Sequence, residues 1–143
     1  MPIVLFDDAL EHLTRIYRVL RLDCGHLLLI GAGGCGKKLL SKLAIFTCQY
    51  KLFEIELTRI YNELSFREDL KILFYQIGLK NRKTVFMLND AQIIDENFLE
   101  YINHILSNGF IPTLFSDEVF KLIDSKIYFF FMFILFEGKR KYY

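Results

Sequence analysis

Residues 27–37 read LLLIGAGGCGK, an apolar run followed directly by a glycine-rich loop and a lysine. Four consecutive apolar side chains suit a strand that is buried on both faces of a parallel sheet. The glycines allow a tight turn whose backbone N–H groups can point inward at an anion. The spacing fits the pattern G-x-x-x-x-G-K of a phosphate loop. We therefore predict a nucleotide-binding loop between a strand and a helix, whose positive N-terminal end would add to the binding.

The predicted ligands of the nucleotide phosphates are the residues of this loop. They are Gly31, Ala32, Gly33, Gly34, Cys35, Gly36, Lys37 and Lys38. Lys37 is expected to reach the β- and γ-phosphates as a mobile point charge. The alternative is a flexible glycine-rich surface turn, but such a turn requires neither four glycines nor a lysine at this position.

The residue after Lys37 departs from the usual phosphate loop. Such loops end in Ser or Thr, whose hydroxyl ligates Mg²⁺, whereas this chain has Lys38. Ser41 is the nearest hydroxyl, and it lies about one helical turn, roughly 5 Å, too far along the helix. We therefore expect weak Mg²⁺ ligation unless water or phosphate oxygens supply the missing ligand.

Asp90 follows a third apolar run, residues 84–88, where ATPases of this class hold Mg²⁺ through water. The alternative is a turn residue at the end of a strand, because Asn-Asp is common in turns. Together with the phosphate loop, the position favours a metal role. The next residue is Ala91 rather than a glutamate that could polarise an attacking water. The guanine-binding motif N-K-x-D is absent, which favours ATP over GTP.

The remainder of the chain alternates helices and strands. Apolar spacing predicts helices that begin near residues 7, 39, 65 and 95, and strands at 27–30, 52–57 and 84–88. The first helix should bury Leu10, Leu13, Tyr17 and Leu20. Ser65 and Glu68 have the spacing of a capping box, and Gly78 and Gly109 are expected helix ends. This alternation predicts an α/β fold with a parallel sheet.

Composition excludes several classes of protein. The 143 residues suffice for one domain, and 18 basic against 17 acidic side chains leave no basic face for nucleic acid. The three cysteines show no spacing of a disulfide framework or a zinc site. The N-terminus lacks the basic region of a signal peptide, so a reducing, cytoplasmic setting is expected.

Several strings along the chain resemble one family together. They are FDDALEH at 6–12, FEIEL at 53–57, FREDLK at 66–71, NDAQI at 89–93, FLEYIN at 98–103 and PTLF at 112–115. With the phosphate loop, they resemble a dynein heavy chain, and most narrowly the fourth AAA module of the motor ring of axonemal kinds. The family loop reads G-x-G-G-S-G-K-Q-S, so that Cys35, Lys38 and Leu39 replace two serines and a glutamine.

The resemblance implies an AAA-type P-loop NTPase fold, which is a three-layer α/β sandwich with a parallel sheet, truncated here after the third family strand. It implies a partial module over residues 1–118 and an aromatic-rich C-terminal tail over 119–143. The implied ligands are ATP and Mg²⁺. The implied partners are neighbouring AAA modules of a dynein ring and, through the full motor, microtubules, in the cytoplasm, the cytoskeleton and the ciliary axoneme. No nucleic acid or membrane partner is expected.

Three functions remain open from the sequence. The first is an ATP-hydrolysing module of a microtubule motor. The second is a regulatory module that binds nucleotide without hydrolysing it and favours one conformation of the ring. The third is a truncated product without activity. The family uses an arginine from a neighbouring module to stabilise the transition state, so hydrolysis by this chain alone is not expected.

The tail contains the uninterrupted apolar run IYFFFMFILF at 127–136. A membrane anchor is the alternative, but a spanning helix needs about 20 apolar residues. The aromatic and β-branched side chains instead indicate a buried strand. In the resembled family, the strand that follows the Asp90 strand lies between that strand and the phosphate-loop strand. We therefore predict that residues 127–136 fill this central slot as a parallel strand and that one edge of the sheet remains open.

Overall fold

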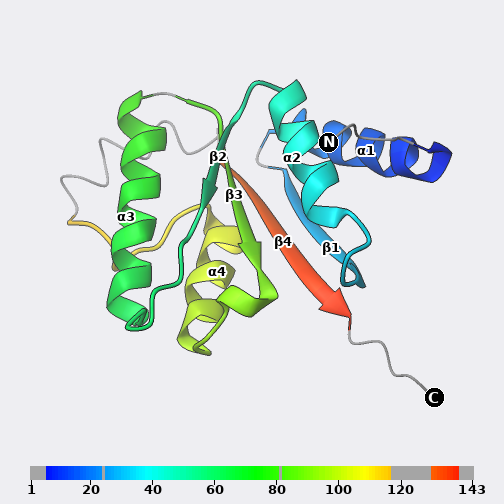
Figure 1. Ribbon diagram of the computed structural model, residues 1–143. Helices are drawn as coiled ribbons and strands as arrows, with labels where there is room; N and C mark the ends of the chain where they lie inside the picture. The colour runs from blue at the N-terminus through cyan, green and yellow to red at the C-terminus, as the bar shows by residue number, and fades with distance from the viewer. Residues whose placement is uncertain (1–5, 24, 81, 117–129, 139–143) are drawn as a thin grey trace, which may run out of the picture.

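A parallel sheet lies between two layers of helices in the computed structural model (Figure 1). The structure describes residues 6–23, 25–80, 82–116 and 130–138, with residues 79–80 and 130–138 described by their backbone alone. The helices are α1 (Asp7–Leu20), α2 (Lys37–Thr47), α3 (Glu63–Lys80) and α4 (Asn97–Asn108). The strands are β1 (His26–Ala32), β2 (Lys51–Glu54), β3 (Thr84–Asn89) and β4 (Phe130–Gly138), and a 3₁₀ turn, η1 (Asp90–Gln92), follows β3.

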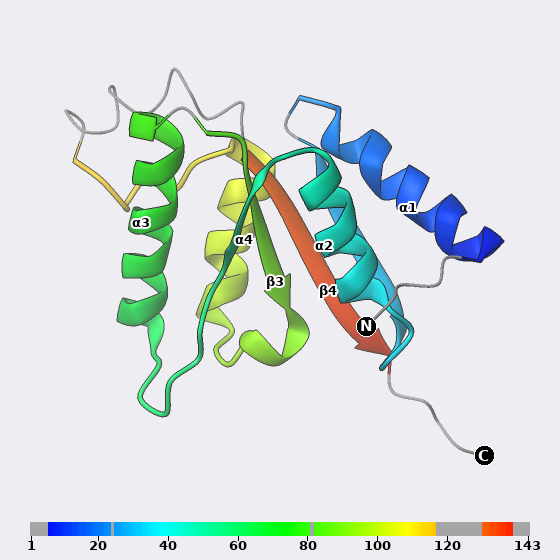
Figure 2. The ribbon, with the colours of Figure 1, turned by 45° about the horizontal axis from the view of Figure 1, so that its top comes forward.

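The described part of the sheet has the strand order β1-β4-β3-β2, and all three neighbouring pairs are parallel. The predicted α/β fold with a parallel sheet is therefore confirmed. Strand β2 is shorter than predicted and ends at Glu54. Because the strands run in one direction, the phosphate loop after β1 and η1 after β3 lie at the same end of the sheet, where the strands have their carboxyl ends (Figure 2).

The strand from the tail occupies the central slot that the sequence predicts for it. In the register of the sheet, Leu28 of β1 is level with Ile134 of β4, and Leu88 of β3 is level with the same residue. Residues 127–129 of the predicted strand lie outside the described residues. The boundary between residues 118 and 119 lies outside them as well and stays a prediction.

Helices α1 and α2 cover one face of the sheet. Their core contains Ile16 and Leu20 of α1, Ala44 and Ile45 of α2, and Val85 and Met87 of β3. The predicted apolar face of α1 is partly wrong, because Leu10 and Tyr17 are exposed and Ile16 takes their place against the core. The helical spacing is right, but the stripe that faces α2 and the sheet is rotated.

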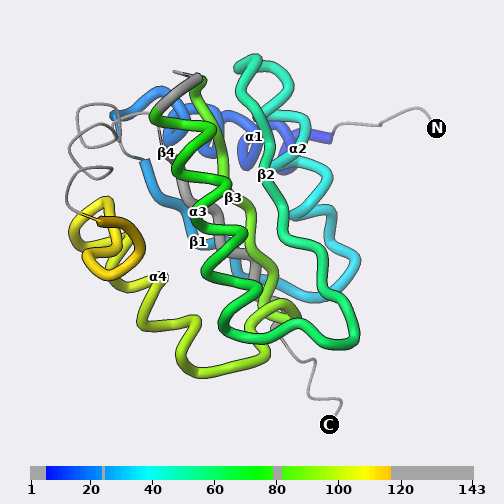
Figure 3. Tube along the Cα trace, turned by 90° about the vertical axis from the view of Figure 1, so that its left-hand side faces the viewer, coloured from blue at the N-terminus to red at the C-terminus, as the bar shows by residue number. Residues whose placement is uncertain are grey.

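Helices α3 and α4 cover the opposite face of the sheet. This core includes Phe66 and Leu70 of α3 and Phe98 of α4, together with Phe86 of β3. The rings of Phe66 and Phe98 stack with centroids 4.2 Å apart and planes at 9°. Figure 3 views the molecule from the side on which α3 lies. No helix in the described ranges is long and apolar enough to span a membrane.

The ends of α3 differ from the prediction, whereas the C-terminal end of α4 agrees with it. The Ser65 amide donates a hydrogen bond to Oδ1 of Asn62 at 3.0 Å. Because Asn62 is therefore the capping residue, α3 begins at Glu63, two residues before the predicted capping box. The helix also continues past Gly78 to Lys80. Helix α4 ends as expected, with Gly109 in the left-handed region at a φ of 75°.

Strand β1 is not buried on both faces as predicted. Its side chains alternate, so that Leu27 and Leu29 pack on the core under α1 and α2. Leu28 and Ile30 are 53% and 71% exposed. The reason is the position of the strand. It lies at the edge of the described sheet, and α3 and α4 pack over β2 and β3 instead (Figure 1).

Candidate functional site

The glycine-rich loop has the backbone geometry of an anion-binding turn. It joins the end of β1 to the start of α2, with Gly34 and Gly36 at φ values of 76° and 84°. These left-handed conformations strain any residue that carries a Cβ, so they explain why glycine is needed at both positions. Gly36 is also the capping residue of α2. The first amides of α2 have no acceptor within the helix, which leaves them for an anion at the loop.

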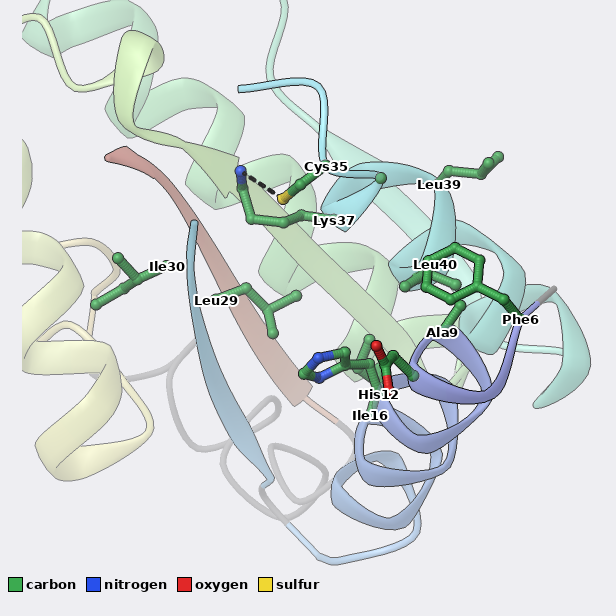
Figure 4. Close-up of a pocket in the computed structure, with 12 residues that line it drawn as sticks. Phe6, Ala9, His12, Ile16, Leu29, Ile30, Cys35, Lys37, Leu39 and Leu40 are labelled. Atoms are coloured by element: carbon green, nitrogen blue, oxygen red, sulfur yellow. Dashed lines mark hydrogen bonds between the residues drawn. The ribbon is translucent and has the colours of Figure 1, made fainter. Parts of the chain in front are cut away.

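Lys37 folds back over the end of β1. Its ammonium donates hydrogen bonds to the carbonyl oxygens of Gly31 at 2.8 Å and Ala32 at 2.7 Å. The Sγ atom of Cys35 lies 3.5 Å from the same ammonium (Figure 4). A Cβ at Gly31 would approach this sulfur to 3.2 Å, so the loop is tightly folded there. The Lys37 ammonium, which would bind phosphate, is thus held in place by two carbonyl oxygens of its own loop.

Lys38 pairs with an acidic side chain at the end of β2. Its Nζ lies 3.0 Å from Oε1 of Glu54, and Nζ of Lys42 lies 2.8 Å from Oε2 of the same residue. Burial by itself would raise the pKa of Glu54, but the hydrogen bonds from Lys42 and Lys38 outweigh it and hold the pKa below its ordinary value. The carboxylate therefore stays ionised and holds both lysines.

Ser41 is fully buried on α2. Its hydroxyl donates a hydrogen bond to the carbonyl oxygen of Lys37 at 2.9 Å. This bond to the preceding turn of the helix is a common use of serine inside a helix. The arrangement agrees with the expectation that Ser41 does not replace the missing hydroxyl at the position of Lys38.

Asn89 and Asp90 follow one another at the carboxyl end of β3. Asn89 lines a cavity of about 280 Å³ together with Gly34, Cys35, Gly36, Lys37, Lys38 and Leu39. Its backbone amide donates a hydrogen bond to Oε1 of Gln92 at 2.7 Å, as part of a capping box that the two residues form at η1. Asp90 begins η1, and its Oδ1 accepts a hydrogen bond from the amide of Ala91 at 2.8 Å. The metal role of Asp90 stays a prediction.

A second cavity, of about 400 Å³, adjoins the phosphate loop. It lies between the start of α1, strand β1 and the first turns of α2, and its lining includes Phe6, His12, Leu29, Leu39 and Leu40 (Figure 4). Cys35, Gly36 and Lys37 line this cavity as well as the first one. An apolar cavity beside convergent polar groups is the usual form of a small-molecule site.

The structure thus brings the predicted loop residues together with three features that the sequence analysis does not identify. These are the pairing of Lys38 with Glu54, the position of Asn89 at the loop, and the apolar cavity beside it. A polar residue at the carboxyl end of a buried strand is the signal that could have indicated Asn89. The partner of Lys38 has no such local signal.

Comparison with known proteins gives consistent matches. The family model described as "P-loop containing dynein motor region D4" matches residues 1–128. Dynein axonemal heavy chain 10 of Homo sapiens is 53% identical over 127 residues, which are 89% of this chain and 3% of that protein. The Dynein-1-alpha heavy chain of the flagellar inner arm I1 complex of Chlamydomonas reinhardtii is 55% identical over 115 residues, which are 80% of this chain and 2% of that protein. The chain therefore spans a very small part of these relatives.

Proposed function

We propose that this chain, which belongs to the family of P-loop containing dynein motor region D4, binds ATP at the loop between β1 and α2. One observation carries the proposal. The loop residues Cys35, Gly36 and Lys37 border both the cavity at Asn89 and the apolar cavity beside α1. The cavity at Asn89 could thus hold the charged phosphate chain, and the adjoining apolar cavity could hold the base.

The phosphates would bind at the loop and the N-terminus of α2. There, Lys37 would exchange the carbonyl oxygens of Gly31 and Ala32 for phosphate oxygens, to which its ammonium donates stronger, charge-assisted hydrogen bonds. The base would enter the apolar cavity beside Phe6 and Leu40. Adenine is preferred to guanine because the sequence lacks the motif N-K-x-D.

The proposed wider role is that of a nucleotide-binding module within a microtubule motor. The support comes from relatives whose names include axonemal and flagellar dynein heavy chains. Neighbouring AAA modules of a dynein ring would be its direct partners, and microtubules would be reached only through the full motor. The corresponding locations are the cytoskeleton and the ciliary axoneme.

A regulatory role is the second candidate, and two residues favour it over hydrolysis. Lys38 stands where phosphate loops in general carry the hydroxyl that ligates Mg²⁺, and Ala91 stands where a glutamate could polarise water. Nucleotide binding without turnover would then favour one conformation of the ring. Mg²⁺-dependent release of phosphate from ATP would instead support an ATPase.

Titration calorimetry with ATP, both in Mg²⁺ and in EDTA, tests the proposal. We expect saturable binding that Lys37→Ala weakens about 10- to 100-fold, the range for loss of a charge-assisted hydrogen bond. Lys71→Ala is the matched control, because its ammonium pairs with Glu68 at 2.8 Å on α3, which packs on the opposite face of the sheet. Equal affinities for the wild-type chain and Lys37→Ala would contradict the phosphate-loop assignment. No binding in either condition would indicate an inactive product.

A further inference from the structure

We propose that the site binds its nucleotide without a divalent cation and that Lys38 supplies the positive charge that Mg²⁺ would otherwise provide. The inference rests on the proposed function, since it concerns the same loop. It goes beyond that function by identifying the ligand as the metal-free nucleotide. The ammonium of Lys38 would move from Glu54 to the phosphate oxygens.

The phosphate loop itself offers no side-chain ligand to a divalent cation, and Asp90 at the end of β3 would be a single carboxylate, whose Oδ1 already accepts a hydrogen bond from the amide of Ala91. Lys38 has no acceptor atom and a positive charge, so it cannot ligate a metal and would repel one. The hydroxyl of Ser41 is fully buried and is already bonded to the carbonyl oxygen of Lys37. Within the described residues, no group of three or more His, Cys, Asp or Glu side chains could hold a metal ion by itself, so a divalent cation here would depend on the phosphates and on one or two carboxylates. Carboxylates are the protein ligands that Mg²⁺ usually takes beside phosphates.

The position of Lys38 instead allows its ammonium to bind the phosphates. It lines the 280 Å³ cavity together with Lys37 and Asn89. Its side chain is 58% exposed and that of Glu54 is 27% exposed, so the lysine end of the pair lies in water. Exposed ion pairs contribute little to stability, and the lysine can therefore leave its partner at small cost. An ammonium on a flexible stem then becomes available at the loop.

Glu54 keeps one positively charged partner when the ammonium of Lys38 moves to the phosphates. Lys42 remains 2.8 Å from the other carboxylate oxygen, one turn further along α2. The carboxylate thus has one permanent partner and one that can be exchanged. This arrangement explains why two lysines of α2 converge on one acid at the end of β2.

The charges of the two loop lysines suit a nucleotide without its metal. Lys38 adds a second positive charge at the loop beside that of Lys37, which ordinary phosphate loops carry together with Mg²⁺. Each ammonium can donate charge-assisted hydrogen bonds to phosphate oxygens. Ammonium groups do not replace the bridging of the β- and γ-phosphates by which a metal assists phosphoryl transfer. The site would accordingly hold ATP rather than cleave it.

The test measures the affinity of the full chain for ATP in EDTA and in Mg²⁺. For the wild-type chain, we expect dissociation constants that agree within about twofold. Lys38→Ser should weaken binding in EDTA by about 10- to 100-fold, the effect of losing one charge-assisted hydrogen bond. Because this change introduces the hydroxyl that phosphate loops in general have at this position, Mg²⁺ should recover much of the affinity. Lys38→Met, which removes the charge but adds no hydroxyl, should be equally weak and not recover.

Lys71→Ser is the matched control, since it removes a lysine that is paired with a glutamate on α3, away from the loop. It should bind ATP as the wild-type chain does in both conditions. Wild-type binding that requires Mg²⁺ would overturn the inference and leave the proposed function standing. No ATP binding in either condition would overturn both. Unchanged affinity of folded Lys38→Ser and Lys38→Met in EDTA would show that Lys38 does not contact the phosphates.

Discussion

The two faces of the sheet differ in how completely they are packed. Under α3 and α4, four phenylalanines are at most 1% exposed, and Phe66 and Phe98 stack on each other. Under α1 and α2, the core is smaller, and two cavities open at the phosphate loop. On β1, Leu28 and Ile30 remain exposed.

The difference indicates that the core under α3 and α4 mainly stabilises the fold, whereas the loop region mainly binds ligand. The aromatic core supports β3, and β3 in turn carries Asn89 to the loop. The loop region keeps open space and positive-φ glycines, features that bind ligands but add little to stability. Substitutions under α3 and α4 should therefore affect folding first, whereas substitutions at the loop should affect ATP first.

The largest expected effect is that of Phe98→Ala. Phe98 is fully buried and stacks on Phe66 with ring centroids 4.2 Å apart. Truncation of a buried phenylalanine costs about 3–5 kcal/mol of unfolding free energy, which urea unfolding followed by circular dichroism would measure. Leu99→Ala is the neighbouring control, because Leu99 is 48% exposed. If Phe98→Ala does not fold, Phe98→Leu should still lower stability more than Leu99→Ala does.

Gly36→Ala should have a smaller effect on folding but a specific effect on ATP. A Cβ at Gly36 would meet no atom within 4 Å, so its cost arises from the φ of 84°, about 1–2 kcal/mol for an L-residue. Gly109→Ala is the control, because that residue has a φ of 75° at the far end of α4. We expect similar losses of stability, but weaker ATP binding only for Gly36→Ala. Equal ATP affinities would show that the loop backbone does not cradle the phosphates.

Local sequence patterns predict much of the fold and the position of the phosphate loop. The alternation of apolar runs and helical spacing predicts the α/β order, and the glycine spacing at 31–37 predicts the loop. The apolar run of the tail, placed by family resemblance, predicts the position of β4. These features depend on neighbours in sequence or on a family pattern, so one sequence suffices for them.

The remaining features depend on contacts between distant segments. The exposure of Leu28 is set by how far α3 and α4 extend over the sheet, which strand composition does not encode. The pairing of Lys38 with Glu54 depends on where β2 ends relative to α2. The capping of α3 by Asn62 rather than Ser65 is a competition between two suitable side chains.

Tyr61 should make the stability of the fold on the α3 side depend on pH in the alkaline range. Burial, together with the hydrogen bond to Asp69 at 2.5 Å and the charge of that carboxylate, raises the pKa of Tyr61. In the unfolded chain, tyrosine loses its proton near pH 10. The stability from this raised pKa is therefore present below about pH 10 and lost as the pH rises above it.

Tyr61→Phe tests this assignment. The change should cost about 1 kcal/mol at neutral pH, the value of a typical hydrogen bond. It should also flatten the fall in melting temperature between about pH 9 and pH 11. Thermal unfolding across this range measures both effects. If the wild-type chain and Tyr61→Phe lose stability in parallel above pH 10, then another group is responsible.

The smallest expected effect is that of Leu28→Thr on β1. Leu28 is 53% exposed and lies on the face of β1 opposite to α1 and α2, at the edge of the described sheet. A β-branched polar residue keeps the preference for a strand, and a surface substitution of this kind changes stability by less than about 0.5 kcal/mol. Leu27→Thr, one residue away, should cost clearly more because Leu27 packs against the core under α1 and α2. Leu28→Thr should also reduce concentration-dependent light scattering, because an apolar edge strand promotes association. Equal losses of stability for the two variants would show that the outer face of β1 is covered in solution, and the contrast between the two faces of the sheet would then be smaller than the structure indicates.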